Sequence, residues 1–274
     1  MYLILSASLK SLRTACAGWG TIRSKRTANR GAMPPNAIVT GAARGIGLAI
    51  ARRLAEDGFA TIATDRDVSA LAEEVARQTG QGRMFSAANM DVADRAAVCG
   101  VFDRVGVVHV VVNNAGIAAP MIAFKSLTQE ELRRVVRVNT SGTFIVAQEA
   151  ARRMAKGGRI INIASRGYLG GAGASHYVAS KAAVVGLTRA MAIELRWKGI
   201  TVNAVAPGMV DTQMITDFTS EQMSALLARE PSGKATPPNT IAGVVSFLAS
   251  PAAEFINGQV LVTDGGKSVG MPTL

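Results

Sequence analysis

From residue 36 onward, short apolar runs rich in β-branched residues alternate with longer segments of helical periodicity, and this alternation restricts the possible folds strongly. Strands are predicted at residues 37–40, 59–64, 107–112, 159–164, 200–205 and 259–263, with a further one before Met90. Helices are predicted at residues 48–57, 70–78, 177–197 and 240–248, and another begins at the capping box Thr128–Glu131 and runs toward Met154. Strands that alternate with helices form parallel βαβ units. The pattern therefore predicts one α/β domain built on a parallel sheet.

The positive charge of the chain is concentrated near its N-terminal end. The 274 residues include 30 Lys and Arg against 19 Asp and Glu, and six of the basic residues lie within the first 33 positions. The remainder carries 24 basic against 19 acidic residues and shows no stripe of basic and aromatic side chains, so we expect no nucleic-acid partner. Residues 1–33 share no pattern with the rest of the chain, and we interpret them as a basic leader separate from the domain at residues 34–274.

Two interpretations of this leader stay open. An acid-free segment rich in Arg and Ser is typical of an organellar transit peptide, which would direct the protein to the mitochondrial matrix. Alternatively, the segment reflects an upstream start codon, and Met33 is the first residue of a cytoplasmic protein. The only two cysteines, Cys16 and Cys99, fit a reducing compartment. No apolar run reaches the length of about 18 residues that a membrane span needs, so no membrane association is expected.

A glycine-rich turn, Thr40–Gly47, joins the first predicted strand to the first predicted helix with the spacing G-x-x-x-G-x-G. Glycines at such a turn let the backbone approach a pyrophosphate, which then sits at the helix N-terminus. Asp65 ends the second strand 20 residues after Gly45, where its carboxylate can accept hydrogen bonds from adenosine ribose hydroxyls. Arg66 comes directly after it and could instead meet a 2′-phosphate, so this pair leaves both NAD and NADP open.

Four motifs occur in the order and spacing of the short-chain dehydrogenase/reductase family, which the chain resembles over roughly residues 36–266. They are Thr40–Gly47, Asn113-Asn114-Ala115-Gly116, Tyr177-Val-Ala-Ser-Lys181 and Pro207-Gly208. Within the family, the chain looks like the 3-oxoacyl-carrier-protein reductase type, whose members act on many different substrates. The resemblance implies a Rossmann-type sheet of seven parallel strands with helices on both faces, and a homotetramer.

The resemblance also implies a catalytic set of Asn139, Ser165, Tyr177 and Lys181. In the family, the tyrosine exchanges the proton, the serine orients the substrate oxygen, the lysine lowers the tyrosine pKa and holds the nicotinamide ribose, and the asparagine holds a water of the proton relay. The implied cofactor-binding residues are Gly41, Arg44, Gly45, Ile46, Gly47, Asp65, Asp91, Val92, Asn113, Ala115, Gly116, Tyr177, Lys181, Pro207, Gly208, Val210 and Thr212. Residues 213–234 correspond to the region that closes over the substrate.

One spacing departs from the family pattern. Tyr177 lies 12 residues after Ser165, whereas the family more often shows 13. The glycine-rich stretch at residues 167–175 can absorb such a deletion, so the assignment of Ser165 is retained.

Tyr177 and Lys181 occupy positions i and i+4 of one predicted helix, so their side chains share a face. A tyrosine pKa lies near 10, and lowering it to about 7 requires roughly 4 kcal/mol. A cation some 4–5 Å away supplies about 3–4 kcal/mol at an effective dielectric near 20. We therefore expect Lys181, helped by the positive nicotinamide of the oxidised cofactor, to lower the Tyr177 pKa.

The sequence thus predicts an NAD(P)-dependent oxidoreductase (EC 1.1.1.-) that interconverts a small secondary alcohol and a ketone. NAD is the expected cofactor because Asp65 would repel the 2′-phosphate of NADP. The alternative is a redox sensor that binds the dinucleotide without turnover, but such a protein has no need of the Asn, Ser, Tyr and Lys set. No His, Cys and Asp cluster has metal-ligand spacing, so no metal is expected.

Overall fold

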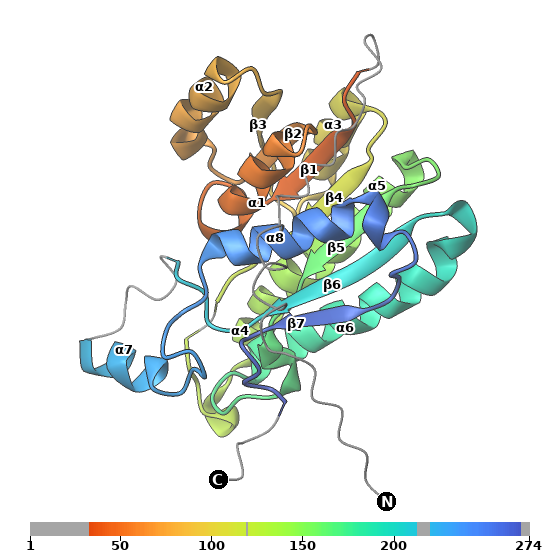
Figure 1. Ribbon diagram of the computed structural model, residues 1–274. Helices are drawn as coiled ribbons and strands as arrows, with labels where there is room; N and C mark the ends of the chain where they lie inside the picture. The colour runs from red at the N-terminus through yellow and green to blue at the C-terminus, as the bar shows by residue number, and fades with distance from the viewer. Residues whose placement is uncertain (1–32, 119, 213–219, 270–274) are drawn as a thin grey trace, which may run out of the picture. The chain divides into compact units, whose positions relative to one another are not determined.

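The computed structural model describes residues 33–118, 120–212 and 220–269, which form one sheet between two layers of helices (Figure 1). Within these residues, seven parallel strands pair in the order β3-β2-β1-β4-β5-β6-β7. The strands are β1 (Asn36–Thr40), β2 (Ala60–Asp65), β3 (Phe85–Asn89), β4 (Val110–Asn113), β5 (Arg159–Ile163), β6 (Thr201–Pro207) and β7 (Val260–Thr263). The predicted Rossmann-type, doubly wound sheet is therefore confirmed.

Side chains of the central strands alternate between the two faces of the sheet, and both faces are buried. In β1, Ala37 and Val39 pack into the core on one side, while Ile38 packs into the core on the other. In β4, Val112 and Val111 divide in the same way. A sheet covered on both faces needs apolar residues at successive positions, which explains why these strands read as continuous apolar runs.

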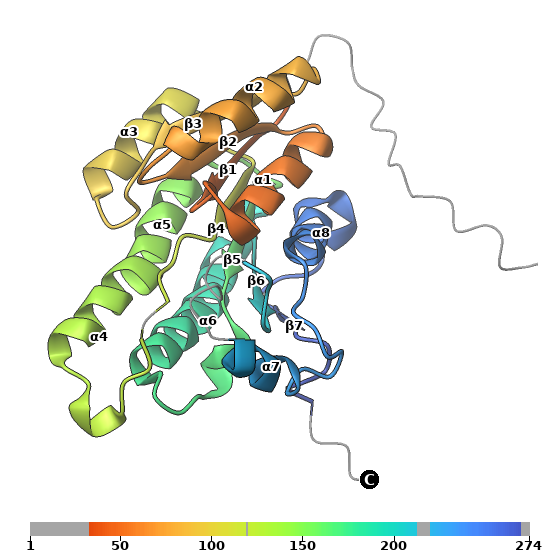
Figure 2. The same ribbon diagram turned by 90° about the vertical axis from the view of Figure 1, so that its left-hand side faces the viewer.

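Helices cover the two faces of the sheet in separate sets (Figure 2). One set is α1 (Gly45–Glu56), α2 (Ala72–Gly80) and α8 (Pro238–Ala249); the other is α3 (Arg95–Val105), α5 (Thr143–Arg153) and α6 (Ser175–Leu195). The remaining helices described are α4 (Gln129–Val136), which precedes α5, and α7 (Ser220–Leu227), which comes after β6. Among the described residues, no helix is both long enough and apolar enough to cross a membrane.

Two helical regions differ from the expectation. The predicted helix that starts at Thr128 does begin there, because the Thr128 hydroxyl accepts a hydrogen bond from the Glu131 N–H at 3.2 Å. It then passes through a π-helical turn at Arg137–Gly142 before α5 continues. Helix α3 was not predicted, because its Ala, Gly and Cys positions weaken the apolar periodicity. Its start is nevertheless marked by Asp94, whose carboxylate accepts a hydrogen bond from the Ala96 N–H.

The parallel arrangement brings the carboxyl ends of all the strands to one edge of the sheet. There, β1 lies between β2 and β4, and the helices that come after β1 and β4 cover opposite faces. Ligands of doubly wound folds bind in the crevice at such a reversal of strand order. The predicted site residues at the ends of β1, β2, β4, β5 and β6 therefore gather at one edge.

Candidate active site

The turn between β1 and α1 has the geometry of a phosphate-binding loop. Gly41 and Gly45 have φ angles of +63° and +58°, a conformation that side chains disfavour. A Cβ on Gly47 would lie 2.1 Å from the Gly41 carbonyl oxygen, so only glycine fits there. Helix α1 starts at Gly45 with no side-chain cap and no acidic residue in its first turn. Its free N–H groups and its dipole suit a pyrophosphate.

The glycine turn is joined to the end of β4 mainly by Thr40 and Asn114, two motif residues for which the sequence analysis predicted no individual role. The Asn114 amide donates hydrogen bonds of 2.9 Å to the carbonyl oxygens of both Thr40 and Gly41. In return, the Thr40 hydroxyl accepts from the backbone N–H groups of Asn114 and Ala115 at 3.0 Å. Neighbouring residues at the end of a strand point in opposite directions. Because Asn113 faces the interior, this alternation could have identified Asn114 as the residue that contacts the glycine turn.

Asn113 itself has a side chain committed to the protein interior. Its amide donates to the Asn162 side-chain oxygen at 2.8 Å, and Asn162 donates in turn to the Thr188 hydroxyl at 2.8 Å. All three residues are buried. This hydrogen-bonded row joins β4, β5 and α6, so the Asn113 side chain aligns the central strands, and a contact with the cofactor stays a prediction.

Three predicted residues lie at the ends of β2 and β3. The Asp65 carboxylate accepts hydrogen bonds from the Ala43 N–H at 3.1 Å and the Arg66 N–H at 2.8 Å, which place it beside the glycine turn. Asp91 caps its own turn by accepting from the Ala93 N–H at 2.9 Å. Val92 is buried, and its Cγ2 would lie 2.6 Å from a Cβ on Gly142, so it packs against the π-helical turn.

Asn139 is fully buried within the π-helical turn and is held at both ends of its amide. Its Oδ1 accepts from the Ile117 N–H at 2.8 Å, and its Nδ2 donates to the Ile117 carbonyl oxygen at 3.2 Å and to the Ser180 hydroxyl at 3.0 Å. A Cβ on Gly116 would lie 3.2 Å from Asn139 Oδ1 and 3.5 Å from Lys181 Nζ. Asn139 therefore sits next to Lys181, and the Gly116 backbone passes close to both.

Ser165, Tyr177 and Lys181 come together at the end of β5 and the start of α6. Ser165 lies just beyond β5, and its hydroxyl oxygen accepts a hydrogen bond from the Gly167 N–H at 3.0 Å. Tyr177 lies close to this hydroxyl, since a Cβ on Gly167 would be 3.2 Å from Ser165 Oγ and 3.4 Å from Tyr177 Cε1, and the Ser165 side chain lowers the Tyr177 pKa. The Lys181 ammonium is buried, donates to the Ile163 carbonyl oxygen at 2.9 Å, and lies 5.9 Å from the centroid of the Tyr177 ring.

Burial dominates the electrostatics of this group in the chain without its cofactor. It raises the pKa of Tyr177, and the Ser165 side chain offsets this only in part. Burial also lowers the pKa of Lys181 to about 8. Desolvation disfavours the charged form of either group. The predicted lowering of the Tyr177 pKa involves the oxidised nicotinamide together with Lys181, so it stays a prediction for the cofactor-bound protein.

The segment after β6 completes this edge of the sheet. Gly208 lies against β7, where its N–H donates to the Thr263 carbonyl oxygen at 3.0 Å. Val210 is buried and pairs with Thr236. The methyl group of Thr212 would lie 3.3 Å from a Cβ on Gly45, so the segment reaches the glycine turn. Of the region expected to close over the substrate, residues 213–219 lie outside the described residues.

The other predicted cofactor residues lie around the same edge. Pro207 ends β6, Ile46 packs partly buried against the core beneath α1, and Arg44 is exposed at the α1 N-terminus. Among the described residues, no group of three His, Cys, Asp or Glu side chains could hold a metal ion. The uncapped helix start, the glycine turn and the lysine beside it fit a bound dinucleotide, so the donor set agrees with the predicted cofactor class.

Comparisons with known proteins give the same class. A family profile described as Enoyl-(Acyl carrier protein) reductase matches residues 41–268. The (2S)-[(R)-hydroxy(phenyl)methyl]succinyl-CoA dehydrogenase subunit BbsD of Thauera aromatica is 40% identical over 85% of this chain and 96% of its own length. The 3-oxoacyl-[acyl-carrier-protein] reductase FabG of Vibrio cholerae is 39% identical over 84% of this chain and 96% of its own length.

A solved structure is also similar. The short chain dehydrogenase from Burkholderia cenocepacia J2315 in complex with NADP superimposes with a TM-score of 0.79 and 36% identity, over 86% of this chain and 98% of that one. The fold, the site and these similarities define an NAD(P)-dependent oxidoreductase that acts on hydroxyl or keto groups. The chain belongs to the short-chain dehydrogenase/reductase family and is related to its 3-oxoacyl-carrier-protein reductases.

Proposed function

We propose that the protein interconverts a secondary alcohol and a ketone, with Tyr177 as the general acid and base. Ser165 orients the substrate oxygen, Lys181 stabilises the tyrosinate and holds the nicotinamide ribose, and Asn139 holds a water of the proton relay. The observation that carries the proposal is the grouping of Ser165 and Tyr177 around Gly167, beside the buried ammonium of Lys181. The names of the related proteins support the same chemistry, since both describe enzymes of hydroxyl or oxo groups.

Ser165 keeps a proton to donate. Its oxygen accepts from the Gly167 N–H at 3.0 Å, which leaves the hydroxyl proton for the Tyr177 oxygen or a substrate oxygen. In alcohol oxidation, the Tyr177 phenolate takes the hydroxyl proton of the substrate. In ketone reduction, the Tyr177 hydroxyl returns a proton to the substrate oxygen.

We propose that Lys181 binds both the nicotinamide ribose and the relay water. Of its three N–H donors, one is used by the Ile163 carbonyl oxygen, so two can serve a ribose hydroxyl and the relay water. A bound nicotinamide would accept or supply the hydride and, when oxidised, would add the positive charge that the Tyr177 phenolate needs beyond Lys181. The neighbouring Asn139 amide is fixed by Ile117 and Ser180, which leaves it rigid beside this relay.

We propose NAD as the preferred cofactor, with NADP as the alternative. A 2′-phosphate about 5 Å from the Asp65 carboxylate would feel roughly 3 kcal/mol of repulsion per unit charge at an effective dielectric near 20. Screening and the exposed Arg66 reduce this to about 1–2 kcal/mol, close to tenfold in affinity. Asp65→Ser is expected to weaken NAD and improve NADP in kcat/KM. A wild-type kcat/KM that is equal or higher with NADP would reverse the preference.

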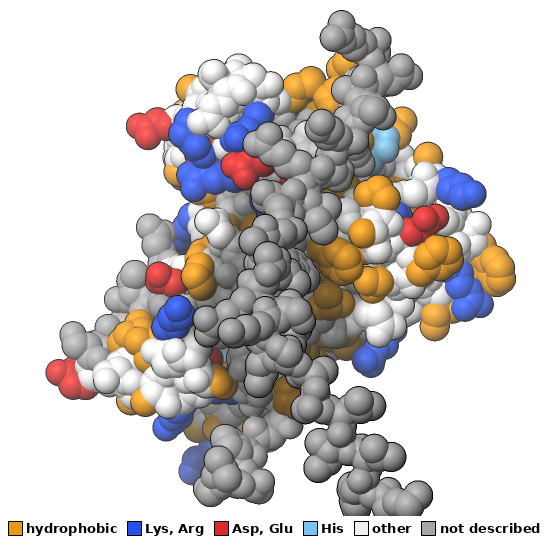
Figure 3. Space-filling model, in the orientation of Figure 1, with side chains coloured by type: hydrophobic (Ala, Val, Ile, Leu, Met, Phe, Trp, Pro, Cys, Tyr) orange, Lys and Arg blue, Asp and Glu red, His pale blue; other side chains and the backbone are white. Residues whose placement is uncertain are grey.

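Three expectations about the whole protein remain predictions. We propose a homotetramer, which exposed apolar side chains on the described surface support; they include Ile193, Trp197, Phe247, Phe255 and Val262. Figure 3 shows such side chains grouped over the side of the molecule formed by β6, β7 and α6. Light scattering of the purified protein measures its mass directly. We also propose that residues 1–33 form a separate leader and that the protein is cytoplasmic, or mitochondrial if the leader is a transit peptide.

A panel of secondary alcohols and ketones, followed by nicotinamide absorbance with both cofactors, tests the proposed reaction. We expect turnover of at least one pair in both directions, with loss of turnover in Tyr177→Phe. If the wild type binds the dinucleotide but turns over no substrate of the panel, the redox-sensor alternative gains support.

A further inference from the structure

Gly167 lies two residues after Ser165, in the short 3₁₀ turn Arg166–Leu169 that connects β5 to α6. A Cβ at this position would lie 3.2 Å from the Ser165 hydroxyl oxygen and 3.4 Å from Tyr177 Cε1. Contacts of 3.2 Å are tighter than ordinary van der Waals contacts. A side chain at position 167 would therefore crowd both proposed catalytic side chains, and the glycine keeps this position clear beside them.

The backbone does not explain this glycine. Among the four glycines at residues 166–175, Gly170 and Gly173 have φ angles of +130° and +72°, which favour glycine whatever surrounds them. Gly167 and Gly171 do not have positive φ angles, so their backbone conformation does not require glycine. A Cβ on Gly171 would meet only ordinary contacts, at 3.8 Å to Val178 and 4.0 Å to Ala174. Space beside Ser165 and Tyr177 is what distinguishes Gly167 within this loop.

The position matters because it borders the reacting atoms. A substrate oxygen hydrogen-bonded to Ser165 and Tyr177 lies about 2.5–3.0 Å from both hydroxyl oxygens. Because a Cβ at position 167 would contact both Ser165 Oγ and Tyr177 Cε1, a side chain there would compete for space with the substituents of the substrate carbon. A neighbouring loop is joined to this one, since the Ile122 N–H donates to the Gly173 carbonyl oxygen at 2.8 Å. These loops carry the exposed apolar side chains Met121 and Leu169.

We infer that Gly167 determines the size of the substrate and admits a branched or ring-bearing apolar group next to the reacting carbon. This inference rests on the proposed alcohol–ketone chemistry. It predicts that a side chain at position 167 excludes bulky substrates while small ones are still accepted. An apolar pocket distinguishes substrates that differ by one methylene by roughly 10–200-fold. Effects of that size are therefore expected from one or three added carbons.

The test compares 1-phenylethanol with 2-butanol in the wild type, Gly167→Ala, Gly167→Val and the matched control Gly171→Ala. The measured quantity is the ratio of kcat/KM for the two alcohols, which cancels any displacement of Ser165 common to both. We expect this ratio to fall at least about tenfold in Gly167→Val and less in Gly167→Ala. It should stay within about twofold of the wild type in Gly171→Ala. An unchanged ratio in both Gly167 variants would overturn the inference.

A binding measurement separates this inference from the proposed reaction. Calorimetry with acetophenone and 2-butanone in the presence of oxidised cofactor reports ketone binding without hydride transfer. If the Gly167 variants bind acetophenone more weakly and 2-butanone as well as the wild type does, the result supports a role of Gly167 in substrate size, even if the wild type turns over neither alcohol. Equal weakening of both ketones, or a wild type that binds 2-butanone but not acetophenone, contradicts it. The Gly167→Ala variant, with one added carbon, keeps the test valid should Gly167→Val fold poorly.

Discussion

The environment of Tyr177 favours the protonated phenol, whereas its proposed role requires the phenolate. Burial raises its pKa, whereas general-base catalysis near neutral pH needs the phenolate. The structure resolves this conflict only in part, because Ser165 and Lys181 are the groups beside it, and burial also lowers the pKa of Lys181, to about 8. We therefore expect the tyrosine of the cofactor-free protein to ionise at alkaline pH, and the oxidised cofactor to shift that ionisation downward.

Tyr177→Phe keeps the ring and removes the hydroxyl, so the packing of α6 should change little. Proton exchange loses its partner, and general acid–base catalysis contributes about 10²–10⁴-fold, so kcat is expected to fall by at least that order. The dissociation constant for NADH should shift only slightly. Tyr168→Phe, in the adjacent 3₁₀ turn, is the control and should retain activity. The alkaline limb of alcohol oxidation should vanish in Tyr177→Phe, and a variant with more than about a tenth of wild-type kcat contradicts the assignment.

Lys181 is expected to contribute to function at the expense of stability. Its pKa is lowered to about 8 in the folded chain, so between about pH 8 and 10.5 the unfolded chain binds the proton and the folded chain does not. The free energy of unfolding of the cofactor-free protein should therefore rise with pH across that window. Lys181→Met removes the buried charge but also the hydrogen bond to Ile163, so we expect about 1–2 kcal/mol of stabilisation at pH 7, with turnover and cofactor affinity lost.

Denaturant unfolding at a series of pH values measures this effect. The rise above pH 8 should be absent in Lys181→Met and present in Lys198→Met, which changes an exposed lysine. A Lys181→Met variant less stable than the wild type at pH 7 would show that the Ile163 hydrogen bond outweighs the cost of burying the ammonium.

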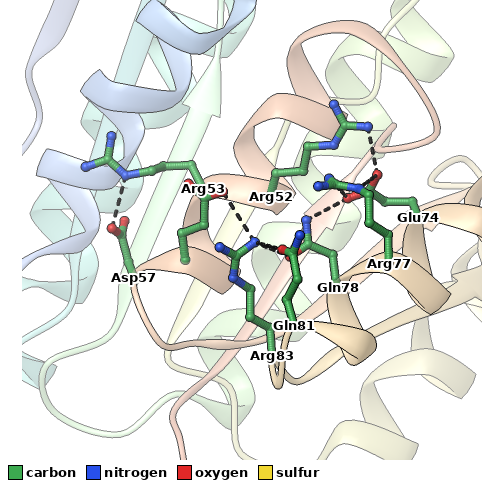
Figure 4. A network of polar contacts seen from close by, with 9 residues as sticks. Arg52, Arg53, Asp57, Glu74, Arg77, Gln78, Gln81 and Arg83 are labelled. Atoms are coloured by element: carbon green, nitrogen blue, oxygen red, sulfur yellow. Dashed lines mark hydrogen bonds and ion pairs between the residues drawn. The ribbon is translucent and has the colours of Figure 1, made fainter.

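At the scale of elements, α1 and α2 are joined by a buried carboxylate rather than by apolar packing alone (Figure 4). Glu74 on α2 is 6% exposed and accepts hydrogen bonds from Arg52 on α1 at 2.7 Å, from Arg77 at 2.6 Å and from Gln78 at 2.7 Å. Burial opposes its ionisation, but these hydrogen bonds and the charge of Arg52 prevail and lower the Glu74 pKa to about 2. The carboxylate thus fixes α2 beside the helix that carries the glycine turn.

Glu74→Gln is expected to destabilise the protein at neutral pH by about 1–2 kcal/mol, since the nearly half-exposed Arg52 and Arg77 are screened by water. Because the folded-state pKa is depressed, the contribution of Glu74 is present above about pH 4.5 and is lost as the pH falls toward 2. Chemical unfolding at pH 7 and pH 3 should show a smaller difference between variant and wild type at pH 3. Glu73→Gln, one position away and exposed, is the control. If Glu74→Gln and Glu73→Gln destabilised the protein equally, the Glu74 carboxylate would not stabilise the contact between α1 and α2 as inferred.

The limits of sequence reasoning are also clearest at the element scale. Continuous apolar runs such as β4 and strong caps such as Thr128 were predictable because burial on both sheet faces and hydrogen-bond capping leave local patterns. The π-helical turn around Asn139 was not, because it depends on backbone partners at Ile117, 22 residues earlier in the chain. The role of Asn114 likewise depends on Thr40, which the fold brings close over 74 residues of sequence. Contacts of that kind are set by topology, not by local spacing.

At the scale of the whole molecule, the motif residues gather at one place because a parallel sheet brings its carboxyl ends to a single edge. The environment of each side chain was harder to foresee, since desolvation depends on how completely β5, α6 and their loops enclose Tyr177 and Lys181. The motifs therefore predicted which side chains lie together, while the directions of their pKa shifts required the structure.

Pro35 and Asn36, near the start of the described residues, make hydrogen bonds to the rest of the fold. The Pro35 carbonyl oxygen accepts from the Ala60 N–H at 3.0 Å, and the Asn36 N–H donates to His109 Nδ1 at 3.1 Å. The Asn36 side chain also donates to the Val107 carbonyl oxygen at 2.8 Å. These bonds join β1 to β2 and to the loop before β4. A chain that begins at Met33 retains all of them.

Removal of residues 1–32 is therefore expected to leave both the melting temperature and kcat/KM unchanged within error. A shorter chain that begins at Ala37 is the matched comparison, because it loses only the Pro35 and Asn36 contacts in addition. It should melt several degrees lower, since about 1 kcal/mol shifts the melting temperature by roughly 2–4 °C in a domain of this size. Differential scanning calorimetry and steady-state kinetics on the three proteins measure both quantities. If the chain that begins at Met33 loses several degrees or much of its activity, residues 1–32 belong to the folded enzyme and not to a separate leader.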